Sequence, residues 1–285
     1  MHALNLKPFS GKWIEDILNL AIKLKKNPEK YYSRLKNKIL VMLFEKTSTR
    51  TRTSFEAGMA QLGGHAIFLD WTTTQLKKAK LKDEIKCIAS YCDIIMARVY
   101  SHDTVKEIAA NSKVPVINGL CDKYHPCQIL GDLQTIKEKF GKLKGLKLAF
   151  IGDGNNVCNS LIIGCKKVGI KISVACPKGF EPLEKPDVLT TDPAKAAEGA
   201  DIVYADTWVS MGQEAEKAKR IKIFKKYQVT KKLLGKALFM HCLPAYRGFE
   251  VTDEVIDSKQ SIVFDQAENR LHAQKALMLT LLEKK

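Results

Sequence analysis

The sequence of 285 residues predicts an α/β protein with two domains, each a mostly parallel sheet flanked by helices. Two observations predict this fold class. Short apolar runs bounded by turn residues alternate with amphipathic segments of helical spacing, which is the pattern of a parallel sheet with crossover helices. The stretch 141–145, rich in glycine and lysine, interrupts this alternation, which restarts beyond it. The second half therefore repeats the architecture of the first half without repeating its sequence.

The first half begins with a helix that Ser10 can cap and in which apolar residues between 13 and 24 form one stripe. Strands are expected at 39–44, 65–69, 93–99 and 114–118, and further helices at 55–62, 81–91, 103–112 and 127–140. Residues 70–80 are polar and irregular, which indicates a loop. The regular alternation favours a parallel sheet for this half.

In the second half, strands are expected at 146–151, 171–176, 187–190, 202–206, 237–244 and 261–264, and helices at 157–168, 214–224 and 266–282. Gly152 and Gly154 follow the first of these strands, as in a dinucleotide-binding turn. Val157 stands where that fingerprint has its third glycine. We interpret the segment as a tight turn that presents Asn155 and Asn156, and we expect no nicotinamide or other cofactor.

The formal net charge of +16 raises the possibility of a nucleic-acid-binding protein. The lysines, however, are spread over four segments in which they alternate with apolar helix positions. No aromatic stacking motif or zinc finger accompanies them in the sequence. We therefore expect no nucleic-acid partner, and we interpret the charge as a basic field that attracts an anionic metabolite.

Targeting and metal-binding patterns are also missing from the sequence. No apolar run approaches the ~20 residues that cross a bilayer, and the first residues do not form a signal or transit pattern. We expect a cytoplasmic protein with no membrane partner. The eight cysteines include no Cys-x-x-Cys pair, and most of them lie in apolar segments. We interpret these as small buried side chains and expect no metal.

The stretch 44–56 carries the clearest chemical signal, because it joins a buried strand to a helix through hydroxyl and guanidinium groups. A helix N-terminus offers N–H groups and a partial positive charge, so it binds anions. Ser48, Thr49 and Thr51 add neutral donors. Arg50 adds a planar group that suits phosphate. The plainer alternative is an N-cap cluster on a surface helix.

Two more groups that can bind an anion are expected near this stretch. Arg98 ends a buried strand, and His125 and Gln128 open a helix. Because the carboxyl ends of parallel strands meet at one edge of a sheet, these side chains should lie close to residues 48–51. Taken singly, an arginine at a strand end or a His-Pro pair at a turn has an equally ordinary structural reading.

Seven motifs occur in order along the chain, at 44–53, 96–100, 125–128, 153–156, 206–212, 241–244 and 268–270. This series resembles the ornithine carbamoyltransferases, within the aspartate/ornithine carbamoyltransferase superfamily, over nearly the whole chain. Residues 48–51 and 125–128 are typical of carbamoyltransferases in general, whereas 206–212 and 241–244 indicate the ornithine branch. The resemblance implies transfer of a carbamoyl group from carbamoyl phosphate to the side-chain amine of L-ornithine. The products would be L-citrulline and phosphate, in arginine synthesis or breakdown.

The resemblance also implies the site residues. Those for carbamoyl phosphate are Ser48, Thr49, Arg50, Thr51, Arg98, His125, Gln128, Arg270, the backbone at Cys242 and Leu243, and Gln75 from a neighbouring subunit. Those for ornithine are Asn156, Asp206, Ser210 and Met211. The catalytic residues among them are Arg50, Arg98, His125 and Cys242.

The chemistry of the family agrees with these residue types. Arginines and helix N–H groups neutralise the phosphate, and Arg50, Arg98 or His125 can donate to the carbamoyl oxygen. The nucleophile is the neutral amine of the substrate, so no covalent enzyme intermediate is required. Cys242 is therefore interpreted as a positioning or proton-handling group, with a thiolate nucleophile as the less favoured alternative. Asp206 has the charge to bind the ammonium group of the amino acid.

The resemblance further implies a carbamoyl phosphate-binding domain at 1–134, completed by a helix at 266–285, and an ornithine-binding domain at 135–265, joined by interdomain helices. It implies a homotrimer or a multiple of trimers. The loop that begins at Gln75 departs from the family, since it is one residue shorter and has Lys80 in place of an acidic residue. Two alternatives stay open, namely an acceptor amine other than ornithine and a catalytically silent paralogue that acts as a binding subunit.

Overall fold

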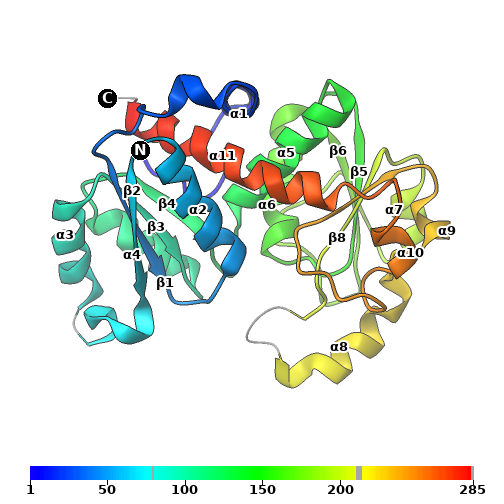
Figure 1. The fold of residues 1–285 in the computed structure, drawn as a ribbon. Coiled ribbons are helices and arrows are strands. Elements are labelled where there is room, and N and C mark those ends of the chain that lie inside the picture. Colours follow the sequence, from blue (N-terminus) through cyan, green and yellow to red (C-terminus); the bar gives the residue numbers. More distant parts are fainter. Residues whose placement is uncertain (79, 210–213, 284–285) are drawn as a thin grey trace. The chain divides into compact units, whose positions relative to one another are not determined.

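A computed structural model describes residues 1–78, 80–209 and 214–283 of the chain (Figure 1). The chain divides into two compact units. The first contains Met1–Gln134 and Asn269–Lys285, and the second contains Thr135–Glu268. The dividing points fall inside two helices, α5 (Pro126–Phe140) and α11 (Val263–Glu283), so these two helices join the units.

The first unit is built on a four-stranded parallel sheet in the order β2-β1-β3-β4. Its strands are β1 (Ile39–Phe44), β2 (His65–Asp70), β3 (Ile94–Arg98) and β4 (Val116–Leu120). Its helices, besides its parts of α5 and α11, are α1 (Gly11–Lys26), α2 (Thr49–Gln61), α3 (Leu81–Tyr91) and α4 (His102–Asn111), with short 3₁₀ turns η1 (Pro28–Tyr31), η2 (Trp71–Thr73) and η3 (Gln75–Lys77). The sheet and its helices can be followed in Figure 1.

The strands β1, β3 and β4 end at the same level, at the carboxyl edge of this sheet. Phe44 is the register partner of Arg98, and Arg98 is the partner of Leu120. β1 and β3 are apolar and almost fully buried because each has a strand on both sides. The segments that leave β1, β3 and β4 therefore begin side by side at one edge of the sheet.

The second unit is built on a five-stranded parallel sheet in the order β7-β6-β5-β8-β9. Its strands are β5 (Lys147–Ile151), β6 (Lys171–Ala175), β7 (Val188–Thr190), β8 (Ile202–Ala205) and β9 (Leu238–His241). Its helices are α6 (Asn156–Val168), α7 (Pro193–Ala197), α8 (Lys217–Phe224), α9 (Lys231–Leu234) and α10 (Asp253–Ile256), with 3₁₀ turns η4 (Glu214–Glu216) and η5 (Lys225–Tyr227). Ala205 pairs with both Ile151 and His241, so β5, β8 and β9 also end level.

The predicted fold class is confirmed, with two corrections to single elements. The strand expected at 261–264 is wrong: Ser261 forms only an isolated bridge to Phe239, and α11 begins at Val263. The helix expected at 55–62 begins six residues earlier, at Thr49, because Ser48 is its N-cap. Five of the eight cysteines are buried, including Cys158 and Cys165 as expected, but the expectation that Cys87 is buried is wrong, because its side chain lies exposed on α3. Among the described residues, no helix is long and apolar enough to cross a membrane.

The turn after β5 depends on a glycine. The N–H of Gly154 donates to the carbonyl of Phe180 at 2.9 Å, which brings two backbone segments into contact. A Cβ at position 154 would lie 2.3 Å from the nitrogen of Pro182 and 2.5 Å from the oxygen of Phe180. Only a residue without a side chain therefore fits between the turn and the segment around Phe180.

We expect Gly154→Ala to lower the free energy of unfolding by about 1–3 kcal/mol, because the added methyl group overlaps rigid backbone. Urea unfolding followed by circular dichroism measures this change. Gly141→Asn is the matched control, since no atom lies within 4 Å of a Cβ there and asparagine tolerates its φ of +70°. Equal stability of the Gly154→Ala variant and the wild type would contradict the packing described for this turn.

Candidate active site

The N-terminus of α2 forms one wall of the candidate site in the first unit. Ser48 is the N-cap, and its hydroxyl accepts a hydrogen bond of 3.2 Å from the N–H of Thr51. Thr49 and Arg50 lie exposed in the first turn, whereas Thr51 is buried. This turn, all of it described, contains no acidic residue. Its N–H groups and the helix dipole can therefore act on an anion without competition from a carboxylate of the same turn.

Arg98 lies beside this helix at the end of β3. Its side chain is 6% exposed, and its Nη1 donates to the hydroxyl of Thr51 at 3.4 Å. The N–H groups of Glu45 and Lys46 donate to the carbonyl of Arg98 at 2.9 and 3.4 Å. The strand end thus holds the backbone of Arg98 where its guanidinium reaches the N-terminus of α2.

His125 lies next to two arginines. It precedes α5, and its side chain is 4% exposed. Burial lowers the pKa of His125 well below its usual 6.5, and the positive charges of Arg270 and Arg98 lower it further. The imidazole is therefore neutral at neutral pH. In this form it can donate a hydrogen bond without adding a third positive charge to the two guanidiniums.

Gln128 connects Arg270 to Asp132. Its Nε2 donates to Asp132 Oδ1 at 2.8 Å, and its Oε1 accepts a hydrogen bond from Arg270 Nη1. All three side chains are buried. Gly131 permits this approach, since a Cβ there would lie 3.1 Å from Cδ of Arg270. The amide of Gln128 is therefore fixed with its oxygen toward the arginine.

The second unit brings Asp206 and Cys242 together. Asp206 directly follows β8 and is 6% exposed, and Cys242 directly follows β9. The thiol of Cys242 donates to Asp206 Oδ1 at 3.0 Å, and Nδ2 of Asn155 donates to Oδ2 of the same carboxylate at 2.7 Å. Asn156, the predicted ornithine ligand, begins α6, while Asn155 before it caps that helix. A carboxylate, a thiol and the asparagine turn thus meet at the carboxyl end of the second sheet.

A buried ion pair supports the same turn. Arg220 of α8 is 4% exposed, and its Nη2 contacts Asp153 Oδ2 while its Nε donates to the carbonyl of Trp208 at 2.5 Å. Burial raises the pKa of Asp153 to about 6, against the opposing effect of Arg220. Arg220 therefore links α8 both to the turn after β5 and to the segment after β8.

Comparisons with known proteins identify the family of the chain. Residues 1–138 match the family model described as the carbamoyl-P binding domain of aspartate/ornithine carbamoyltransferase. Residues 144–281 match the model of the Asp/Orn binding domain of the same family. The chain belongs to the aspartate/ornithine carbamoyltransferase family.

Several relatives in this family are similar to the chain over nearly its full length. An ornithine carbamoyltransferase of Cenarchaeum symbiosum is 54% identical, over 95% of this chain and 94% of its own length. One of Carboxydothermus hydrogenoformans is 50% identical, over 98% and 96%. The solved structure of ornithine carbamoyltransferase from Pyrococcus furiosus superimposes with a TM-score of 0.95 at 46% identity, over 100% of this chain and 97% of that one. The resemblance seen in the sequence motifs is therefore confirmed.

Within this carbamoyltransferase fold, the predicted residues separate by unit. The first unit gathers the side chains of Thr51, Arg98, His125, Gln128 and Arg270, with Ser48 capping the same helix turn. The second unit gathers the side chains of Asp206 and Cys242 beside the asparagine turn. Gln75 lies in η3 with an exposed side chain. Ser210 and Met211 lie outside the described residues.

Sequence reasoning missed three supporting residues of this carbamoyltransferase site. Asp132 follows Gln128 by four residues on a helix, a spacing that could have revealed it. Asp153 and Arg220 are 67 residues apart, and no local pattern connects them. Their contact depends on the tertiary placement of the turn after β5 and of helix α8 within one unit.

Asp206, His241 and Cys242 also form a group that could hold a metal, since one ligand atom of each lies within 4.8 Å of the others. Both ring nitrogens of His241 already face other groups, however. Its Nδ1 accepts from the N–H of Leu243 at 2.9 Å, and its Nε2 lies 3.2 Å from Glu250. The thiol and carboxylate are engaged with each other. The existing contacts of these three side chains therefore do not require a metal.

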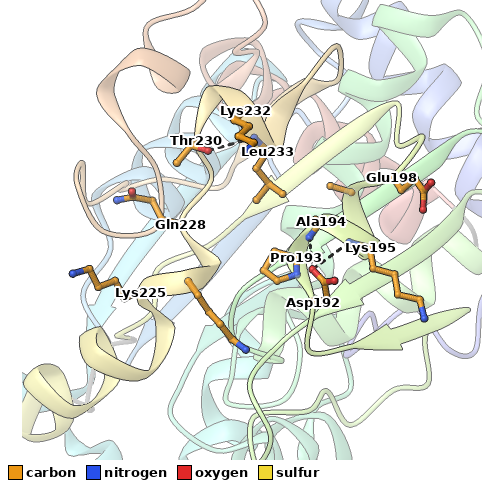
Figure 2. A pocket seen from close by; sticks show the side chains of 12 residues that line it. Asp192, Pro193, Ala194, Lys195, Glu198, Lys225, Gln228, Thr230, Lys232 and Leu233 are labelled. Atoms are coloured by element: carbon orange, nitrogen blue, oxygen red, sulfur yellow. Dashed lines mark hydrogen bonds between the residues drawn. The ribbon is translucent and has the colours of Figure 1, made fainter.

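A cavity of about 870 Å³ lies elsewhere in the second unit, between α7, η5 and α9 (Figure 2). Its lining includes four lysines, among them Lys195 and Lys225, but none of the predicted site residues. Figure 2 shows Lys195 and Lys225 extending in opposite directions. These ammonium groups therefore do not converge on one anion.

The neutral state of His125 gives a prediction about stability and pH. Because folding lowers the pKa of His125, its contribution to stability is fully present above about pH 6.5 and is lost as the pH falls below that value. We expect the wild type to lose more free energy of unfolding than His125→Gln between pH 7 and pH 5. The difference is bounded by about 1.4 kcal/mol per pH unit for one proton.

Urea unfolding at a series of pH values measures this difference. His65→Gln is the control, since His65 is exposed on β2 and its loss should leave the pH dependence unchanged. Parallel stability curves for the wild type and His125→Gln would show that the imidazole is not held neutral between the arginines.

Proposed function

We propose that the protein transfers the carbamoyl group from carbamoyl phosphate to the side-chain amine of L-ornithine, releasing L-citrulline and phosphate. The observation that carries this proposal is the contact of Arg98 with Thr51 at the N-terminus of α2, together with the contact of Arg270 with Gln128, three residues after His125, in the same unit. An acyl phosphate needs cationic and N–H donors of this kind. The ornithine carbamoyltransferases to which the chain is about 50% identical support the choice of substrates.

In this proposal the first unit binds carbamoyl phosphate. The N–H groups of the first turn of α2 and the hydroxyl groups of Ser48 and Thr51 bind the phosphate, with Arg50 and Arg98 neutralising its charge. His125 donates to the carbamoyl oxygen, where negative charge grows as the carbon becomes tetrahedral. Arg270, held by Gln128, adds a second guanidinium beside the leaving phosphate.

The second unit binds the amino acid. Asp206 carries the negative charge that binds the ammonium group of ornithine, and Asn156, Ser210 and Met211 complete the pocket in this proposal. The neutral side-chain amine attacks the carbamoyl carbon with its lone pair. The bond from that carbon to the phosphate oxygen then breaks, phosphate leaves with the electron pair, and the nitrogen loses one proton. Cys242, hydrogen-bonded to Asp206, positions the amine or passes on this proton.

The division of labour between the units follows from these assignments. We assign carbamoyl phosphate binding to residues 1–134 with the C-terminal helix, and ornithine binding to residues 135–265. Most of the rate acceleration then comes from aligning two substrates within fixed charges. We further propose a cytoplasmic homotrimer, or a multiple of it, in which Gln75 serves the site of a neighbouring subunit.

Turnover should depend on Arg50, which lies exposed in the first turn of α2 and serves a ligand. We expect Arg50→Ala to reduce kcat/KM for carbamoyl phosphate by about a hundredfold or more, because a charge that stabilises the transition state is lost. The assay supplies carbamoyl phosphate with a panel of amines and scores each ureido product. Ornithine should be the preferred acceptor in this panel.

The matched control is Arg52→Ala, two residues further along the same helix. The Nε of Arg52 donates to Glu56 at 2.9 Å and its guanidinium lies over the ring of Phe68, so it is occupied on the protein surface. Its loss should leave kcat/KM nearly unchanged. Normal turnover by Arg50→Ala would refute the phosphate site, and a different preferred amine would refute the assignment of ornithine.

A further inference from the structure

The backbone after β9 adopts a conformation that its residue type does not favour. Leu243 has φ +58°, in the left-handed region where bulky side chains are rare. The family resemblance implies that the backbone at Cys242 and Leu243 contacts the carbamoyl group, and we include this contact in the proposed function. The carbamoyl NH₂ can only donate hydrogen bonds, so it needs backbone oxygens held in one orientation. Contacts of neighbouring side chains must maintain this conformation.

The imidazole of His241 supplies one such contact. The N–H of Leu243 donates to Nδ1 of His241 at 2.9 Å. A backbone N–H is always a donor, so Nδ1 must be the nitrogen without a proton. The proton of the neutral ring is therefore on Nε2. The backbone of His241 is fixed by a further hydrogen bond, because Oε1 of Gln266 accepts from the N–H of His241 at 2.9 Å.

Glu250 lies opposite the other ring nitrogen. Its Oε1 is 3.2 Å from Nε2 of His241 without the alignment of a hydrogen bond, so the contact is electrostatic, and both side chains are at most 1% exposed. A carboxylate at this distance favours a proton on Nε2 and so selects the tautomer that Leu243 requires. The same oxygen accepts from the N–H of Tyr246 at 2.6 Å. Glu250 therefore holds the chain on both sides of residues 242–245.

We propose that His241 and Glu250 are positioning residues for the carbamoyl group: Glu250 sets the tautomer of His241, and His241 holds the backbone at Leu243 in the orientation that the substrate needs. This inference rests on the proposed function. Neither side chain touches substrate in it. Their effect passes through the backbone at Leu243.

Three variants separate positioning from simple structural support. Glu250→Gln keeps an oxygen that can accept from His241 and Tyr246, so kcat/KM for carbamoyl phosphate should stay within about threefold of the wild type. Glu250→Ala removes that oxygen and should lower kcat/KM by about tenfold or more. Asp201→Ala is the control. Asp201 accepts from the N–H of Lys147 at 2.8 Å, at the amino end of the same sheet.

We expect Asp201→Ala to have a lower free energy of unfolding but an unchanged kcat/KM. This control separates the loss of a contact between a carboxylate and the backbone from the loss of positioning at Leu243. If Glu250→Ala retains wild-type kcat/KM, or if Asp201→Ala loses as much kcat/KM as Glu250→Ala does, the inference is wrong. Absence of turnover by the wild type with every amine would instead refute the proposed function.

Nitrogen NMR of the wild type reads the tautomer directly and does not depend on activity or on any variant that fails to fold. The chain has only six histidines, so ¹⁵N-histidine labelling gives a simple spectrum, and His241→Gln assigns the signal. We expect Nδ1 of His241 to be unprotonated and Nε2 protonated, with this pattern retained in Glu250→Gln. A proton on Nδ1 in the wild type would overturn the inference.

Discussion

Two guanidinium groups and one imidazole share a buried space at the carboxyl end of the first sheet, and the rest of the site depends on this concentration of charge. Arg98, Arg270 and His125 are each at most 7% exposed. Burying ionised groups costs several kcal/mol each unless other groups compensate. The protein compensates in part by keeping His125 neutral, and in part through the buried carboxylate of Asp132 acting by way of Gln128. In the proposed function, an anionic substrate completes the balance.

The second unit instead buries a carboxyl group at the carboxyl end of its sheet. Asp206 is buried, and its carboxylate accepts hydrogen bonds from Asn155 and Cys242. Both sheets are parallel, so both place their functional groups just beyond level strand ends. In the proposed function, the cationic groups of the first unit and the buried carboxylate of the second unit serve transfer from an acyl phosphate to an amino acid.

Much of the fold and part of the site could be predicted from the sequence. The strand β1 is a continuous apolar run that leads into a Ser-Thr-Arg-Thr turn, so both the strand and the start of the helix after it were visible locally. Arg98 and His125 could be added because parallel strands end at one edge. The apolar run 261–264 was misleading, since Val263 already belongs to a helix whose first residues lie next to β9.

The supporting residues could not be predicted in the same way. Glu250 is nine residues from His241, in a segment without helical or strand periodicity, so nothing in the sequence connects the two. The pair of Asp153 and Arg220 likewise depends on tertiary placement of α8. A sequence pattern reveals functional side chains that directly follow a helix or strand. The residues that support those side chains lie in irregular segments, and their tertiary contacts have no signature in the sequence.

A crystal structure of the protein with bound carbamoyl phosphate, or with a phosphonate analogue that cannot transfer its carbamoyl group, tests the central claim most directly. The phosphate should lie at the N-terminus of α2, within hydrogen-bond distance of the N–H groups of its first turn and of Arg98. A phosphate bound instead in the lysine-lined cavity near Lys195 and Lys225, or at any other surface, would contradict the account.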